Sequence, residues 1–161
     1  SDREYLQMNN LRTILLLLAL VLLPHLTSAQ AINADKTALT NFIIRMYKHA
    51  TFEVKVVEDY EHHYLVSAVK LDPAKYDGNE NTMMRVAGVK AVSQASRFLN
   101  GSNISEDLIV TTRENAEGNI NTETIEKIKE TSIGYVNQLE HLSNFTNDDG
   151  KQVFLYVKQI K

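Results

Sequence analysis

The sequence predicts an α+β fold, with two main helices packed on a small antiparallel sheet that is built from hairpins. Two segments, Asp35 to Ala50 and Met83 to Leu99, repeat apolar residues at the helical period of about 3.6 residues. Between and after them stand β-rich runs that are separated by polar turn residues. A composition of 43% hydrophobic residues, with 17 basic and 20 acidic side chains among 161 residues, suits one ordinary globular domain.

The N-terminal segment has the layout of a secretory signal peptide. An apolar run from Ile14 to Leu23 follows Arg12 and precedes Pro24 and the small residues 27–29. The run is about half as long as the roughly 20 residues that a membrane-spanning helix requires, so no permanent transmembrane anchor is expected. We therefore divide the chain into upstream or expression-derived residues 1–7, a signal peptide at 8–29 and a single α+β domain at 30–161.

The composition also narrows the class of protein. The chain has no cysteine, which excludes disulfides, thiolate metal sites, cysteine nucleophiles and lipid attached to a cysteine. An exported domain without disulfides suits a bacterial envelope better than an animal extracellular setting. Charges of both signs are scattered and the net charge is −3, so the concentrated basic face of a nucleic-acid binder is not expected. These features indicate an exported bacterial protein, periplasmic or at the cell surface.

The first predicted helix runs from Asp35, a suitable N-terminal cap, to Ala50. Two β-rich runs follow at 52–57 and 64–69, and the polar residues 58–63 between them predict a hairpin with a polar loop. The Pro, Asp, Gly and Asn residues of 72–79 predict a surface loop that no helix or strand crosses. The apolar face of the first helix is formed by Leu39, Phe42, Ile43, Met46 and Ala50.

The second predicted helix, Met83 to Leu99, stops at Asn100 and Gly101, a pair that suits a left-handed helix end. Small residues occupy the middle of its apolar stripe, and small side chains let a helix lie close to a sheet. We therefore place this helix against the strands. Further along we expect a third strand at 108–112, a turn at 115–119 and a short helix at 124–131.

The segment 125–142 supports two readings. Its apolar residues stand at heptad-like spacing, which favours one long helix. Against this, Gly134 lies in its interior, and an Asn-Asp-Asp-Gly turn at 147–150 precedes the β-rich run 152–157. Such a turn needs a partner strand on its other side. We therefore predict a strand from about Gly134 to Phe145.

A series of local patterns occurs in the second half of the chain. The patterns are the alanine-spaced helix from Arg85 to Ala95, Leu99-Asn100-Gly101, the strand from Ile104 to Val110, Ser132 to Val136, and Asp149 to Val153. With them, Met83 to Ile160 resembles the N-terminal domain of the flagellar assembly protein T and the related LPP-type outer-membrane lipoproteins. The resemblance implies a helix on a small antiparallel sheet and a non-catalytic role in envelope assembly or protein contacts. Those lipoproteins are anchored through a cysteine, which this chain lacks, so the resemblance does not imply membrane attachment.

One dense group of candidate metal ligands occurs between the two strands of the first hairpin: Glu58, Asp59, Glu61, His62 and His63. Neighbouring residues of an extended segment point to opposite faces, so His62 and His63 would rarely reach one metal ion. We interpret the group as a solvated loop. No metal, no other cofactor and no catalytic residue are predicted, since no nucleophile stands in a pattern such as G-x-S-x-G.

The patterns favour binding as the function. The predicted interaction surface consists of Tyr60, His62, His63 and Tyr64 in the first hairpin, because tyrosine is enriched at protein interfaces. An open edge strand at 153–157 is a second expected contact surface. The sequence thus predicts a non-catalytic protein-interaction or assembly module of the bacterial cell envelope, whose partners are envelope proteins or further copies of the chain.

The alternative function is a small-ligand-binding periplasmic domain, with a hydrolase ranked below it. Its pocket would lie between the second helix and the sheet, where Ala87, Gly88 and Ala91 leave room.

Overall fold

A computed structural model of the chain describes residues 35–60, 62–101, 109–112 and 122–160. The chain divides into two compact units, Ser1–Asn41 and Phe42–Lys161. The first predicted helix is present at 35–49, while residues 1–7 and the predicted signal peptide lie outside the described residues. No helix within the described ranges is long and apolar enough to span a membrane.

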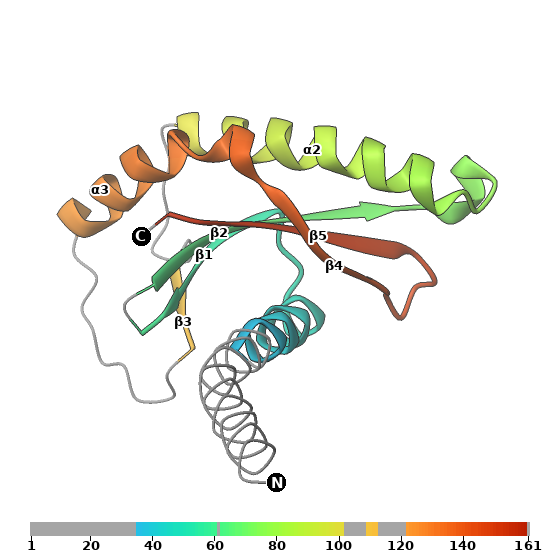
Figure 1. The fold of residues 1–161 in the computed structure, drawn as a ribbon, viewed down its shortest axis with the longest axis horizontal. Coiled ribbons are helices and arrows are strands. Elements are labelled where there is room, and N and C mark those ends of the chain that lie inside the picture. Colours follow the sequence, from blue (N-terminus) through green and yellow to red (C-terminus); the bar gives the residue numbers. More distant parts are fainter. Residues whose placement is uncertain (1–34, 61, 102–108, 113–121, 161) are drawn as a thin grey trace, which may run out of the picture. The chain divides into compact units, whose positions relative to one another are not determined.

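The second unit contains one five-stranded sheet in the order β3-β1-β2-β5-β4 (Figure 1). Neighbouring strands are antiparallel except β1 and β3, which run parallel. The sheet is therefore mixed, and the expectation of an antiparallel sheet is wrong at this edge. Parallel neighbours need a long crossover, which the segment with β2 and helix α2 (Glu80–Asn100) provides. The strands are β1 (Val54–Asp59), β2 (His62–Leu71), β3 (Ile109–Thr111), β4 (Glu140–Thr146) and β5 (Gln152–Gln159).

The first hairpin is longer and tighter than the sequence predicts. β1 and β2 continue to Asp59 and His62 and leave only Tyr60 and residue 61 between them. The predicted polar loop at 58–63 is therefore wrong. Acidic residues of β1 stand opposite histidines of β2, which is a favourable cross-strand arrangement. The pairs are Glu58 with His63 and Asp59 with His62.

The second hairpin joins β4 to β5 through the predicted turn at 147–150, in which Gly150 takes a φ of 74°. This hairpin is confirmed, but its first strand begins at Glu140 instead of Gly134. The preceding residues form helix α3 (Thr122–Ile133) and a short 3₁₀ helix, η3 (Val136–Gln138). The helical reading of this segment is thus right as far as α3 extends, and the strand reading is right from Glu140.

Strand β5 is an inner strand, because β2 and β4 flank it. The expectation that 153–157 forms an open edge is therefore wrong. The outer strands are β3 and β4, and a β-bulge between His141 and Ser143 interrupts the pairing of β4. Bulges are one means by which proteins keep an outer strand from pairing with another chain.

Helix α2 begins three residues before the predicted Met83, because the Asn79 side chain accepts a hydrogen bond from Thr82 N–H and caps the helix there. The preceding segment, 72–79, contains a 3₁₀ helix, η1 (Pro73–Tyr76), which Asp72 caps. The expectation that no helix crosses this loop is therefore wrong. Asp before Pro starts a helical turn as readily as a loop, because proline's fixed φ suits the first helical position.

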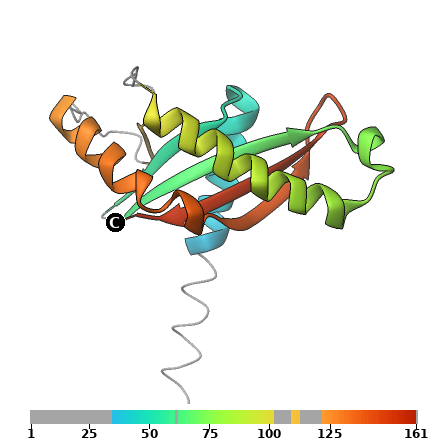
Figure 2. The same cartoon turned by 90° about the horizontal axis from the view of Figure 1, so that it is seen from above.

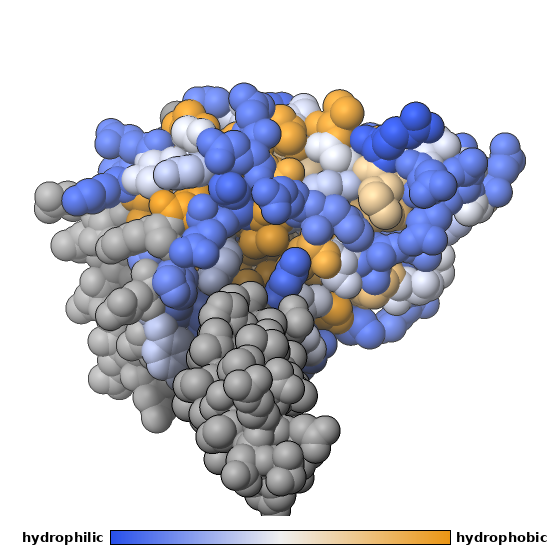
Figure 3. Space-filling model, viewed as in Figure 1, coloured by the Kyte–Doolittle hydropathy of each residue, from blue (hydrophilic) through white to orange (hydrophobic). Residues whose placement is uncertain are grey.

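Helix α2 packs on one face of the sheet, across β2 and β5 (Figure 2). Ala87, Ala91 and Ala95 are completely buried, which confirms that small side chains bring this helix close to the strands. The surface that α2 presents upwards in Figure 3 is mainly polar, with isolated apolar side chains. The apolar partners of α2 on the sheet include Val54, Val56, Leu65, Val69, Leu71, Phe154 and Tyr156.

The opposite face of the sheet is buried as well. Because side chains alternate along a strand, Val57, Val66 and Leu155 point away from α2, and all three are completely buried. On this side Tyr47 packs edge to face against Phe52 and Phe145. Both faces therefore contribute to the core, and the edges of the sheet are where its backbone can meet a ligand.

Candidate functional site

A cleft of about 470 Å³ lies beside the part of β2 that β1 leaves uncovered. β1 begins at Val54, opposite Ser67, whereas β2 continues to Leu71. The floor of the cleft is β2 from Ala68 to Lys70. One wall is α2, with Lys90, Ser93, Gln94 and Arg97, and the other is the segment leading into β1, with Tyr47, Thr51, Phe52 and Glu53.

Gln94 ties the α2 wall to the floor of the cleft. It is only 9% exposed, and its Nε2 donates to Ala68 O at 2.8 Å, Ser67 Oγ at 2.9 Å and Glu53 O at 3.1 Å. Ser67 Oγ donates in turn to Ala91 O at 3.0 Å. Three acceptors around the nitrogen determine the orientation of the amide. Within the described residues, Oε1 of Gln94 therefore accepts no hydrogen bond.

The floor of the cleft offers backbone groups that the sheet does not use. Ala68 N–H donates to Glu53 O at 2.8 Å, so Ala68 directs its backbone groups toward β1. Every second residue of an antiparallel strand points the same way, and Lys70 therefore directs its N–H and C=O past the start of β1. Among the described residues no backbone hydrogen bond beyond the strand ladders involves Lys70. This edge thus presents one donor and one acceptor to the cleft.

Positive charge collects in the cleft, although the chain's net charge is −3. Its lining includes Lys70, Lys90 and Arg97 against one carboxylate, that of Glu53. Lys90 and Arg97 are exposed, and neither forms an ion pair with any residue that the structure describes. Since they stand seven residues apart on α2, both lie on the side of the helix that carries Gln94. The α2 wall thus offers two cations to an anionic group.

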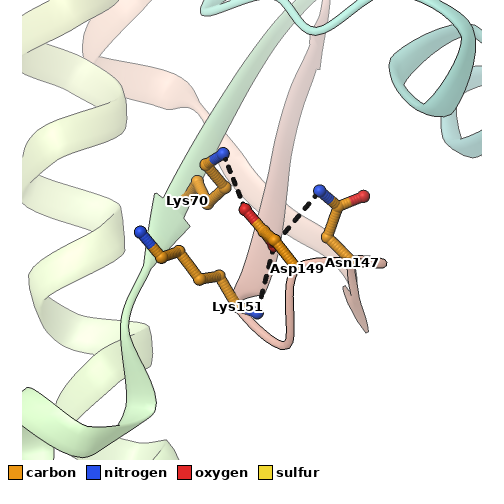
Figure 4. A network of polar contacts seen from close by, with 4 residues as sticks. All are labelled: Lys70, Asn147, Asp149 and Lys151. Carbon is orange, nitrogen blue, oxygen red and sulfur yellow. Dashed lines mark hydrogen bonds and ion pairs between the residues drawn. The ribbon is translucent and has the colours of Figure 1, made fainter.

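Lys70, by contrast, is already paired. Its Nζ lies 3.1 Å from Asp149 Oδ2, and Asp149 also accepts from Lys151 N–H at 3.2 Å and from Asn147 Nδ2 at 3.3 Å (Figure 4). The hydrogen bond with Lys70 is the main cause that lowers the pKa of Asp149, and it also raises the pKa of Lys70. The pair ties the β4–β5 turn to the end of β2. Lys70 therefore adds less positive potential to the cleft than the two unpaired cations do.

The wall opposite α2 is partly aromatic. The ring centroids of Tyr47 and Phe52 are 5.5 Å apart in an edge-to-face arrangement. Burial raises the pKa of Tyr47, against a smaller lowering by Lys70, so the hydroxyl stays protonated at neutral pH and can donate a hydrogen bond. The cleft thus combines an aromatic wall, a cationic wall and an open strand edge.

Side chains occupy the space beneath the small residues of α2, where the sequence predicts a pocket. Ala87 and Ala91 are completely buried. The Tyr156 hydroxyl lies 3.5 Å from the place where a Cβ on Gly88 would stand, and it donates to Met84 O at 2.6 Å. Close packing fills this space, and the cleft opens along the polar side of the same helix instead.

The predicted interaction surface lies at the other end of β2. Tyr60 is 69% exposed and adopts a φ of 54°. His62 Nδ1 is 3.1 Å from Gln159 Nε2, and its ring contacts that of Tyr64 with centroids 6.4 Å apart. Strand alternation sets His63 on the opposite face of the sheet. The structure therefore brings His62 and Tyr64 together, places Tyr60 in the turn beside them, and separates His63 from them.

The described residues contain no group of three or more His, Asp or Glu side chains that could hold a metal ion. Of the candidate ligands in the sequence, Glu61 lies outside those residues. His62 and His63 are neighbours in β2 and so project from opposite faces of the strand.

Sequence reasoning missed the residues of the α2 wall: Lys90, Gln94 and Arg97. One signal could have found them. Gln94 stands beside the alanine stripe of the predicted helix, and a large amide at such a buried position needs hydrogen-bond partners. Lys90 and Arg97 border it at helical spacing.

Comparisons of the chain with protein-family models, with curated proteins and with solved structures found no match. The cleft is therefore interpreted from its own chemistry.

Proposed function

We propose that this chain is a non-catalytic binding module of the bacterial cell envelope and that it binds through the cleft beside β2. The observation that carries the proposal is the pair of cations on α2. Lys90 and Arg97 have no ion-pair partner among the described residues, and they border a cleft whose floor has unused backbone groups. Cations placed in this way favour a ligand with an anionic group, since charge-assisted hydrogen bonds are the stronger ones.

The composition of the cleft supports binding over chemistry. Its lining contains hydroxyl, amide and cationic groups but no histidine, and its one carboxylate, Glu53, is exposed. A serine nucleophile needs a base within hydrogen-bond reach. The lining offers Ser93 no imidazole for that role, whereas convergent polar groups around an aromatic wall are typical of a ligand site.

The proposed location rests on the sequence. The apolar run 14–23 and its flanking residues predict export, and the lack of cysteine suits an envelope protein without disulfides. The resemblance of Met83 to Ile160 to bacterial envelope domains points to the same compartment.

The proposal is tested by thermal unfolding of the mature chain with inorganic phosphate, acetate and citrate. A ligand that binds only the folded state stabilises it by about 2.7 kcal/mol at a hundredfold excess over Kd. We expect this stabilisation in the unchanged chain and in R85Q, which removes an exposed cation of α2 outside the cleft. The K90Q/R97Q double variant should lose it. Equal losses in both variants would show that the anion is held by general surface charge.

A second candidate function is contact with a partner protein through the β1–β2 turn. The observation in its favour is Tyr60, a large side chain that is 69% exposed and held at a positive φ. Such a conformation costs free energy in a residue other than glycine, and costs of this kind cluster at functional sites.

This second function is tested by a cross-linked pull-down of the mature chain from its native envelope. Tyr60→Ala should remove a specific partner, while Val89→Ala, which shortens an exposed apolar residue of α2, should leave it in place. Capture that survives both substitutions would exclude the turn. Light scattering after size-exclusion chromatography would separate self-association from contact with another protein.

A further inference from the structure

We propose that the cleft receives the carboxyl-terminal residues of a partner polypeptide, which lie extended along the open edge of β2 with their free carboxylate on Lys90 and Arg97. This inference rests on the proposed function, because it names the ligand of the same cleft.

The first support is the open strand edge. The pairing of β1 with β2 extends only to Val54 opposite Ser67, and one further hydrogen bond joins Ala68 N–H to Glu53 O at 2.8 Å. One step further, Lys70 directs a donor and an acceptor into the cleft. An extended peptide supplies the complementary acceptor and donor at one of its own residues, as in other cases of β-strand addition. A rounded anion such as phosphate would use the donor and leave the acceptor without a partner.

The second support is the position of the cations. Lys90 and Arg97 are two helical turns apart on α2, about 10 Å along the axis, and α2 forms the wall beside the open edge. The long side chains of Lys and Arg can converge on one carboxylate between these two positions, where Ser93 and Gln94 stand. A peptide paired with Lys70 would thus bring its last carboxylate to a wall that already holds uncompensated positive charge.

The third support is the balance of charge. Lys70 is neutralised by Asp149 at 3.1 Å, which leaves Lys90 and Arg97 against the single carboxylate of Glu53 in the lining. The remainder is one positive charge. A main-chain terminus carries one negative charge, so its carboxylate matches this remainder, whereas an internal peptide segment with neutral side chains brings no charge.

The remaining polar group also fits a peptide. Gln94 Nε2 is consumed by three protein acceptors, while its Oε1 accepts no hydrogen bond from the described residues. A peptide N–H is the kind of donor that this oxygen lacks. Gln94 is 9% exposed and fixed on three sides, so it is a pre-organised acceptor.

The test uses the mature chain labelled with ¹⁵N and two pools of hexapeptides with mixed sequence and acetylated N-termini. One pool ends in a free carboxylate and the other in an amide. We expect the free-acid pool to shift the backbone amide resonance of Lys70. The amide pool should bind with an affinity that is lower by up to about tenfold for each charge-assisted contact that it loses. N-methylation of the peptide backbone at one of its last three residues should abolish the shift of the Lys70 resonance.

Variants of the protein locate the carboxylate. K90Q and R97Q should each lower the affinity for the free-acid pool by about tenfold and leave the affinity for the amide pool unchanged. R85Q is the control and should bind as the unchanged chain does. Amide and free-acid pools that bind equally well would overturn the proposal.

The outcomes also separate this inference from the proposed function. If phosphate or acetate shifts the amides of the cleft residues and neither peptide pool does, the cleft binds anions and the peptide inference fails alone. If no anion and no peptide shifts them, both fail.

Discussion

The two ends of β2 carry two different kinds of surface. At its start, the β1–β2 turn exposes Tyr60 beside His62 and Tyr64, which are close in the sequence. At its end, the cleft assembles Lys70 with Gln94 and Arg97, which come from segments far apart in the chain. The turn displays the exposed side chain of Tyr60, whereas the cleft surrounds unused backbone and side-chain groups.

The two ends also differ in what maintains them. The cleft depends on the hydrogen bonds of Gln94, which join α2 to Ser67, Ala68 and Glu53. The turn depends on backbone conformation, since Tyr60 adopts a φ of 54°. We therefore expect substitution of Gln94 to affect stability strongly and substitutions in the turn to affect it weakly or in the opposite direction.

The largest expected effect is that of Gln94→Leu. The substitution removes the donor to the buried Ala68 O and Ser67 Oγ, and to Glu53 O, which keeps its hydrogen bond from Ala68 N–H. A buried acceptor left without a partner costs free energy of desolvation. We expect unfolding free energy to fall by about 2–4 kcal/mol in urea denaturation. The matched control, Ser93→Ala, changes the exposed neighbour and should stay within about 0.5 kcal/mol of the unchanged chain. A Gln94→Leu variant of unchanged stability would mean that the Gln94 hydrogen bonds do not hold the cleft together.

At the opposite end, Tyr60→Asn should stabilise the fold. Asn adopts a positive φ more readily than a bulky side chain does, so we expect a gain of about 0.5–1 kcal/mol in the same assay. Tyr60→Phe keeps the size and the backbone cost, so it should not show this gain. If Tyr60→Asn destabilises the chain, the contacts of the Tyr60 side chain outweigh its backbone cost.

His141 belongs to neither end and supplies an independent reference for pH dependence. Its Nε2 is buried without a hydrogen-bond partner among the described residues, and its ring lies against Tyr156 at 5.5 Å between centroids. Burial is the main cause that lowers the pKa of His141 from its ordinary value of 6.5. The unfolded chain therefore binds a proton more readily, and stability should fall as the pH drops below 6.5 through the lowered pKa. His141→Gln should remove part of this slope, and His49→Gln, at an exposed histidine, should not.

The smallest expected effect concerns the ion pair at the edge of the cleft. Lys70 lowers the pKa of Asp149 from its ordinary value of 3.8, so the contribution of Asp149 is present above that value and is lost as the pH falls through the lowered pKa. Both side chains are well exposed, and exposed pairs contribute little. Asp149→Asn should flatten the acid side of the thermal-stability profile slightly. Asp148→Asn, in the same turn, should leave the profile unchanged, and equal effects of the two would exclude a special role for the pair with Lys70.

Much of the fold was predictable from local patterns. The alanine stripe of α2 and the Asp-Gly turn before β5 both depend on residues within a few positions of one another. The errors fall where a local pattern has two solutions. At 125–142 the heptad-like spacing favoured a helix, whereas Gly134 and the turn at 147–150 favoured a strand. The chain uses α3 first and β4 afterwards.

The first hairpin shows a second kind of error. Its polar residues, Glu58 to His63, were assigned to a loop because polar runs commonly form loops. In the structure Glu58 and His63 are paired across the two strands. The longer strands gain cross-strand contacts, which the polarity of the individual residues does not predict.

By itself, the sequence determined the helices at 35–49 and α2, both hairpins, and the close approach of α2 to the sheet, because periodicity and turn chemistry act over short distances along the chain. The tertiary structure alone decided that β3 runs parallel to β1, that β5 is an inner strand, and that β2 extends beyond its pairing with β1. Strand order and register depend on contacts between distant segments. The cleft exists only through those contacts, because it forms where one strand ends and its neighbour continues beside α2.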